Sequence, residues 1–211
     1  MAGKATDLLA DVARYYAGRL AEHGDTPRGV DWNGEEGQLE RFGQLARVIS
    51  VPAGFSVNDL GCGYGALLEF LRDAYSDFYY TGYDVSAEMV AAARKRLGTE
   101  GRARFAVAGR PDQSADYGIA SGIFNVRLGR GPDEWLAYIH ETLDALDATS
   151  RRGFAFNCLT SYSDADRMRD DLYYADPCAL FDRCKRRYAR DVALLHDYGL
   201  YEFTILVRKD A

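Results

Sequence analysis

The sequence predicts an α/β fold built on a mostly parallel sheet. After residue 52, short apolar runs alternate with segments of helical periodicity, a pattern typical of strands joined by crossover helices. The chain has 211 residues, 47% of them hydrophobic, enough for one core of ordinary size. Its 21 glycines and 5 prolines are far below the fraction that marks low-complexity or collagen-like chains. We therefore expect a folded α/β protein and exclude a disordered or fibrous one.

The charge balance argues against nucleic acid as a partner. There are 26 Lys and Arg residues against 32 Asp and Glu residues, and the net charge of −6 repels a phosphate backbone. No apolar run approaches the roughly 18 residues of a membrane span, and the start MAGKATDLLADVARYY carries aspartates where a signal peptide needs apolar residues. We expect a cytoplasmic monomer or homodimer with no nucleic-acid and no membrane partner.

The four cysteines indicate neither a disulfide framework nor a metal site. Cys62, Cys158, Cys178 and Cys184 form no CxxC pair and no Cys/His group at zinc spacing. We expect free thiols in a reducing compartment and no bound metal.

Two helices are expected before the first strand. Apolar residues recur every three or four positions over residues 6–22, and a second helix is expected to begin at Asn33, which has capping-box spacing to Glu36. The loop of residues 23–37 holds four glycines and Trp32. It is either a lid with one aromatic anchor or a surface linker whose tryptophan fills the core.

The remaining elements follow from alternating strand and helix signals. A helix capped by Ser86 is expected to end before Gly98, and another to open at Pro132. The last two apolar runs, 192–196 and 201–207, are separated by only four residues, too few for a parallel crossover, so they predict an antiparallel hairpin. The other strands are expected at residues 56–60, 79–83, 103–107, 117–124 and 153–159.

A glycine-rich turn between the first of these strands and a helix points to a nucleotide-like cofactor. In VNDLGCGYGA, Gly61, Gly63 and Gly65 allow a sharp turn and a close backbone approach to a ligand. The same stretch also fits the GxGxxA dinucleotide pattern, a weak signal, or a plain tight turn. Asp59 favours a different ligand, because its carboxylate repels a pyrophosphate and suits an ammonium group.

An acidic residue ends the second predicted strand. Asp84 lies 23 residues after Gly61, where a carboxylate can accept hydrogen bonds from both ribose hydroxyls of a nucleoside. Val85 and Met89 then face the adenine as apolar neighbours. The alternative is that Asp84 is a helix cap or a surface charge.

Two stretches resemble motifs of the class I S-adenosylmethionine-dependent methyltransferases. NDLGCGYGALLEFL is similar to their acidic-glycine loop, and YTGYDVSAEMVAAARKR to their second motif. The closing hairpin is similar to the end of their seven-stranded, Rossmann-like sheet. The resemblance spans about residues 38–209. HGDTPRGVDWN, ASGIFNVR, FNCLTSY and HDYGLYEFTILVRK more narrowly resemble a bacterial branch of small-molecule methyltransferases.

The resemblance implies S-adenosyl-L-methionine as the cofactor. We expect a helical cap and lid at residues 1–50 and a catalytic domain at residues 51–211. After the third strand the sequence reads Val-Ala-Gly-Arg at 107–110, where the family often has an acidic or polar residue for the adenine amino group. The residues expected to bind the cofactor are Asp59, Gly61, Cys62, Gly63, Gly65, Asp84, Val85, Met89 and Ser121.

A methyl acceptor is expected at the same edge of the sheet. Ligands of open α/β sheets bind outside the carboxyl ends of the strands, where the segment 121–125 and Asn157 are also predicted to lie. Asn125 and Asn157 either orient the acceptor or satisfy turn backbone. The side chains of a type able to take a proton from the acceptor are Tyr16, Tyr162, Asp164, His140 and His196.

Together these observations predict an enzyme that methylates a small polar metabolite. Transfer from a sulfonium needs no metal, because the leaving group is already activated, so positioning carries most of the rate. The alternatives are an RNA or protein methyltransferase, a nicotinamide-binding Rossmann protein, and a catalytically silent protein that binds the cofactor.

Overall fold

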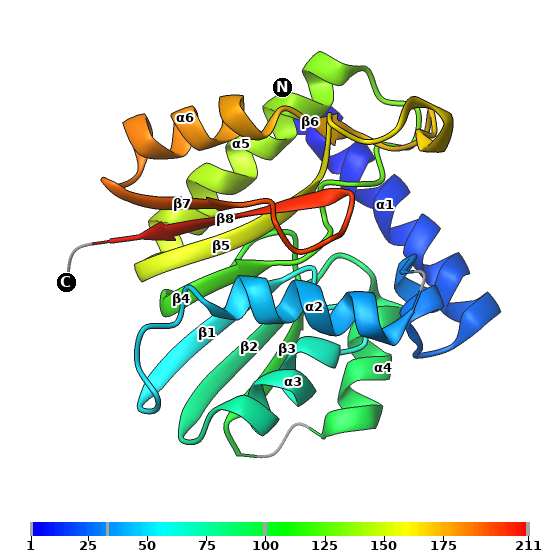
Figure 1. Cartoon of the computed structure of the whole chain (residues 1–211). Coiled ribbons are helices and arrows are strands. Elements are labelled where there is room, and N and C mark those ends of the chain that lie inside the picture. The colour runs from blue at the N-terminus through cyan, green and yellow to red at the C-terminus, as the bar shows by residue number, and fades with distance from the viewer. Residues whose placement is uncertain (1, 33, 99–100, 210–211) are drawn as a thin grey trace.

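The computed structural model describes residues 2–32, 34–98 and 101–209, which form helices packed on one mixed sheet (Figure 1). The strands follow the order β3-β2-β1-β4-β5-β8-β7, and a short strand, β6, pairs with β5 outside this path. Their bounds are β1 Phe55–Leu60, β2 Phe78–Asp84, β3 Ala103–Val107, β4 Ala115–Ala120, β5 Ser150–Thr160, β6 Tyr174–Ala175, β7 Asp191–Leu195 and β8 Glu202–Arg208.

Strands β1 to β5 are parallel, and the order of the sheet reverses beside β1. The chain runs outward through β2 and β3, then crosses to the other side of β1 to form β4 and β5. Such a switch point leaves a crevice at the carboxyl ends of the strands, because the two neighbouring connections depart toward opposite faces. The topology therefore places the ligand site at the ends of β1 and β4.

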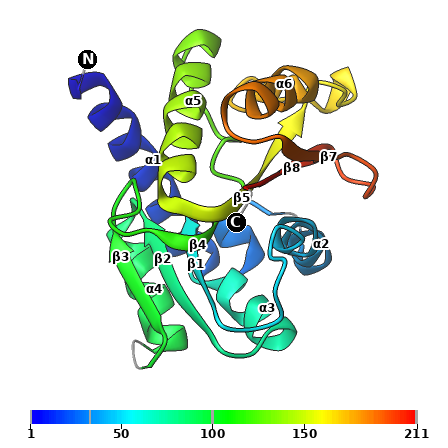
Figure 2. The ribbon, with the colours of Figure 1, turned by 90° about the vertical axis from the view of Figure 1, so that its left-hand side faces the viewer.

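Helices cover both faces of the sheet and give the protein two cores (Figure 2). One core contains Leu45 and Leu71 and lies under α2, α3 and α4. The other contains Leu143 and Leu180 and lies under α5 and α6, with Leu8 of α1 at its margin. The helix bounds are α1 Ala2–His23, α2 Glu35–Ala46, α3 Ala66–Ala74, α4 Ala87–Leu97, α5 Pro132–Thr149 and α6 Pro177–Arg187.

The structure confirms the predicted class of fold, including the hairpin of β7 and β8. The seven expected strands are present, with β6 as an eighth, and α6 is a helix that the sequence analysis did not predict. The prediction of a strand up to residue 124 is wrong. The strand β4 ends at Ala120, and Gly122 adopts a left-handed φ of 73° that turns the chain out of the sheet.

The two N-terminal helices have different surroundings. The helix α1 packs on α4 and on the short 3₁₀ helix Pro27–Val30, whereas α2 lies on β5 and β8 and contributes Phe42 to the core. The expected cap at Asn33 lies outside the described residues, and α2 begins at Glu35. The division into a cap at 1–50 and a domain at 51–211 stays a prediction.

Within the described ranges, no helix combines the length and the apolar composition that a bilayer crossing requires.

Candidate active site

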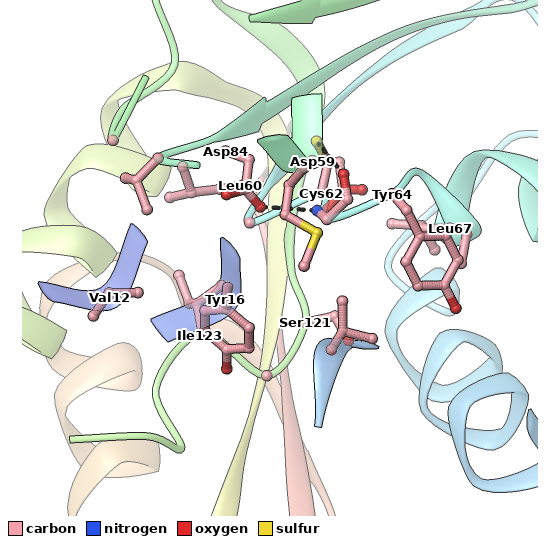
Figure 3. A pocket seen from close by; sticks show the side chains of 18 of the residues that line it. Val12, Tyr16, Asp59, Leu60, Cys62, Tyr64, Leu67, Asp84, Ser121 and Ile123 are labelled. Carbon is pink, nitrogen blue, oxygen red and sulfur yellow. Dashed lines mark hydrogen bonds between the residues drawn. The ribbon is translucent and has the colours of Figure 1, made fainter. Parts of the chain in front are cut away.

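A cavity opens at the carboxyl ends of β1, β2 and β4, where the topology predicts it (Figure 3). The space between its walls, with the open mouth included, is about 910 Å³. Asp59 and Asp84 lie on one side of the cavity, and Tyr16, Ser121 and Ile123 lie on the other. Among the residues that the structure describes, no Lys, Arg or His side chain lines it.

The glycine loop after β1 forms the floor of the cavity. The backbone N–H groups of Gly61 and Cys62 both donate to the carbonyl of Tyr83, at 2.7 and 3.0 Å. Gly63 has a left-handed φ of 53°, and a Cβ there would lie 3.1 Å from Val30 Cγ1. Glycine is required at this position because any other residue would be strained at this φ, and its side chain would press against Val30. The burial that surrounds Cys62 raises the pKa of its thiol, which keeps it neutral.

Asp84 joins the floor to the start of α4. Its Oδ2 accepts from Gly63 N at 2.9 Å and its Oδ1 from Ser86 N at 2.9 Å. Burial raises the pKa of Asp84, and these backbone donors oppose the rise. Each carboxylate oxygen retains a second acceptor direction. Asp84 is not the helix cap, because Ser86 Oγ accepts from Met89 N in that role.

Asp59 is a second buried acid at the cavity. Its Oδ2 accepts a hydrogen bond from the Tyr80 hydroxyl at 2.5 Å. Burial raises the pKa of Asp59 to about 7, with Asp84 adding to the rise and the bond from Tyr80 opposing it. Two acids in a cavity without a lining cation favour a ligand that carries positive charge.

Beside Asp84 one part of the cavity, here called the slot, has an apolar lining. Val85 and Met89 line it, as do Ala108 and Gly109 after β3. A Cβ at Gly109 would lie 2.8 Å from Leu9 Cδ1 of α1, so the slot is closed tightly from above. Among the described residues, the acids that line the cavity are Asp59 and Asp84, and none replaces the acidic or polar residue that is missing at 107–110. Ala108 N donates to the Asp84 carbonyl at 2.9 Å.

The loop after β4 forms the wall opposite the acids. Ser121 Oγ is buried and has no hydrogen-bond partner within the described part of the chain. An orphaned hydroxyl at a cavity is costly unless a ligand or water satisfies it. Next to it, a Cβ at Gly122 would lie 2.4 Å from Cζ2 of Trp32, so this tryptophan rests directly on the loop.

Three predicted site residues do not line the cavity. Gly65 is the N-cap residue before α3, and a Cβ there would lie 2.4 Å from Leu97 Cδ1. Asn125 Oδ1 accepts from Leu159 N at 3.1 Å, and Asn157 Oδ1 accepts from Gly122 N at 2.8 Å. Both asparagines are buried and hold backbone, which fits the alternative interpretation that they satisfy turns.

Tyr16 does line the cavity, in an apolar setting. Burial raises its pKa well above the usual range, so the phenol stays protonated at neutral pH and is a donor rather than a ready base. His140, His196, Tyr162 and Asp164 do not line the cavity. Across the described ranges, no group of three or more His, Cys, Asp or Glu side chains is placed to hold a metal ion.

Several lining residues were missed by the sequence analysis. The Tyr64 hydroxyl donates to Gln38 Oε1 of α2 at 3.1 Å, joining the glycine loop to the N-terminal segment. Tyr138 of α5 also lines the cavity, and burial raises its pKa to about 12. The sequence places Tyr64 in the glycine loop and Tyr138 in a helix, but only the packing of these elements reveals that both side chains reach this cavity.

Comparisons with known proteins assign the class. Residues 58–145 match the family model described as "Methyltransferase domain". The chain is 65% identical over 163 residues to Rv1506c of Mycobacterium tuberculosis, a protein named as a methyltransferase, covering 77% of this chain and 98% of that protein. The protein therefore belongs to the methyltransferase family.

Solved structures show the same fold at low identity. The complex of DhpI with SAM and HEP superposes with a TM-score of 0.65 at 17% identity, covering 96% of this chain and 98% of DhpI. A SAM-dependent methyltransferase of Leishmania major gives a TM-score of 0.63 at 15% identity, covering 96% and 83%. The magnesium protoporphyrin IX methyltransferase of Synechocystis, with bound SAH, gives 0.56 at 15% identity, covering 74% and 75%.

Proposed function

We propose that this protein binds S-adenosylmethionine and transfers its methyl group to a small polar metabolite. The observation that supports the small acceptor is the position of Trp32, which lines the cavity with its ring against Gly122 of the wall opposite the acids. We propose that this ring covers the cavity. A nucleic-acid strand or a folded protein segment needs an open face, whereas a metabolite fits under such a cover.

The described residues fit the cofactor. Asp84 has acceptor directions left for the ribose hydroxyls, and Val85 with Met89 lines the slot that suits adenine. Asp59 is placed to accept the cofactor ammonium group, and Ser121 Oγ lacks a partner that a bound ligand would provide. The cofactor supplies a methyl group on a positively charged sulfur, so no further activation of the leaving group is needed.

The protein's own contribution is positioning and exclusion of water. Tyr16 and Tyr138 present protonated hydroxyls that can donate to an acceptor, and Tyr64 is held in place by Gln38. The absence of a lining cation, within the described residues, favours a neutral or cationic acceptor over a phosphate or a carboxylate. The net charge of −6 likewise disfavours RNA.

Calorimetric titration with S-adenosylmethionine, S-adenosylhomocysteine and a nicotinamide dinucleotide tests the cofactor. We expect binding of the first two, and binding of the dinucleotide alone would contradict the proposal. Incubation with cofactor labelled in the methyl group then tests the acceptor, using a small-metabolite extract, bulk RNA and mixed peptides in parallel. Label in a metabolite is the expected result, and label confined to RNA or peptide would overturn the small-acceptor part.

A further inference from the structure

A chain of largely buried side chains links Trp32 with Gly122 in the loop after β4. The guanidinium carbon of Arg41 lies 3.9 Å from the centroid of the Trp32 ring. Arg41 Nε donates to Glu202 Oε2 at 2.8 Å, and Asn157 Nδ2 donates to the same oxygen at 2.5 Å. Asn157 Oδ1 accepts from Gly122 N at 2.8 Å, and Gly122 packs against Trp32. The contacts therefore form a closed ring that begins and ends at Trp32.

The burial of this ring indicates that it is held firmly. The side chain of Glu202 is 2% exposed and that of Arg41 12%, and Asn157 is fully buried. A carboxylate at this depth is tolerated only when it is paired and hydrogen-bonded. Because one oxygen, Oε2, accepts from both neighbours, a shift of either neighbour changes the bond to the other.

The ring connects segments that are distant in the sequence but border the same cavity. Arg41 belongs to α2, Glu202 begins β8 and Asn157 lies in β5, where α2 packs across both strands. Two members of the ring, Trp32 and Gly122, line the cavity, whereas the other three do not. These three residues thus contact the residues that line the cavity but do not line it themselves.

We propose that Glu202 is a positioning residue that couples the Trp32 cover to the loop after β4. Its carboxylate holds Arg41 under the tryptophan and Asn157 on the loop N–H, so that the cover and the loop take up the closed arrangement together. The consequence for methyl transfer rests on the proposed function, because it assumes that cofactor and acceptor occupy this cavity. The coupling itself is a property of the free protein.

Acrylamide quenching of tryptophan fluorescence tests the coupling without any ligand. The protein has two tryptophans, and Trp135 is 1% exposed, so quenching reports Trp32. In Glu202→Gln the ion pair with Arg41 is lost, and both Arg41 and Asn157 then donate to a neutral amide oxygen, so both bonds become weaker. We expect the Trp32 quenching constant to rise and its emission to shift to longer wavelength. Arg41→Met, which keeps the apolar stem, should do the same and replaces the first variant if that one does not fold.

A matched control separates coupling from general loss of stability. Asp116 accepts from Ser56 N at 2.8 Å and from Arg151, but at the amino end of β4, away from the cavity. Asp116→Asn makes the same chemical change and should leave Trp32 quenching unaltered. The double variant Glu202→Gln with Arg41→Met should be quenched no more than Arg41→Met alone, because both substitutions break one pathway.

Calorimetry separates this inference from the proposed function. We expect S-adenosylmethionine to bind Glu202→Gln at least about fivefold more weakly than the parent, the lower end of coupling between sites. Trp32 quenching that stays at the parent value in a folded Glu202→Gln and in Arg41→Met would overturn the coupling. Failure of the parent to bind S-adenosylmethionine would instead overturn the proposed function and leave the quenching result standing.

Discussion

The floor and the roof of the cavity are built in different ways. The floor consists of turns after β1 and β2, where backbone N–H groups and the Asp84 carboxylate fix one another and Gly63 has a left-handed φ. The roof consists of side chains from α1 and the segment before α2, such as Leu9 and Trp32. Apolar packing, the cation–π contact of Trp32 and side-chain bonds such as Tyr15 to Asp31 hold these elements. A floor made of backbone suits a cofactor whose shape does not vary. A roof made of side chains can change with the acceptor while the fold stays the same.

The largest effect is expected from a substitution that places a side chain in the floor. Gly63→Val places a β-branched residue at a left-handed φ and fills space under Val30. We expect S-adenosylmethionine affinity to fall by more than about a thousandfold, or about 4 kcal/mol, by calorimetry. Gly98→Val is the control, because Gly98 has a φ of 73° with open space around it. Gly98→Val should be less stable but should still bind S-adenosylmethionine. If both variants bind it equally well, the glycine loop after β1 is only a tight turn.

Loss of the floor carboxylate should have the next largest effect. Asp84→Ala removes the acceptor for Gly63 N and Ser86 N, and with it hydrogen bonds to the cofactor worth roughly 1.5–3 kcal/mol each. We expect about a hundredfold weaker S-adenosylmethionine binding, measured by calorimetry. Asp112→Ala, which removes an exposed carboxylate bonded to Arg104 and Tyr83, should bind normally. Unchanged affinity in folded Asp84→Ala would remove this residue from the site.

A change in the roof should affect turnover more than cofactor binding. Trp32→Ala removes the ring that rests on Gly122 but leaves the floor intact. We expect cofactor affinity to stay within about tenfold and methyl transfer to fall about a hundredfold, the scale of lost positioning. Steady-state kinetics on the acceptor identified by labelling checks this, with Leu39→Ala, an exposed residue of α2, as the control. A parallel loss of binding and turnover would assign Trp32 to the cofactor site instead.

The smallest expected effect is on the pH dependence of stability. Burial raises the pKa of Asp59 to about 7, from about 4 in the unfolded chain, so the folded protein binds a proton that the unfolded chain has released. Stability should therefore fall as the pH rises from about 4 to about 7 and level off above that. Asp59→Asn, which can still accept from Tyr80, should flatten this part of the curve. Thermal unfolding of the parent and of Asp59→Asn between pH 4 and 8 measures this pH dependence. Identical slopes of stability against pH in the two proteins would show that Asp59 is ionised throughout.

Local chemistry explains why the floor could be predicted from the sequence. Alternating glycines, an acid at a strand end and a helix cap at Ser86 act within a few residues, so Gly63 and Asp84 were identified without knowing the fold. The closing hairpin was predictable for the same reason, since four linking residues cannot make a crossover. These features depend on the spacing of residues along the chain, which can be read directly from the sequence.

The rest of the site depends on packing between distant segments. The sequence showed that Asn157 would lie near the sheet edge, but only the pairing of β5 with β8 directs its amide toward Glu202 and Gly122. The sequence also left open whether Trp32 anchors a lid or fills the core, and only the tertiary structure shows that its ring lies against Gly122. Side-chain direction and burial follow from which elements meet, and strands alternate their faces at every residue. The glycine loop and the acid at the end of β2 were thus determined by the sequence alone, whereas the roof and its ring of contacts exist only through the tertiary structure.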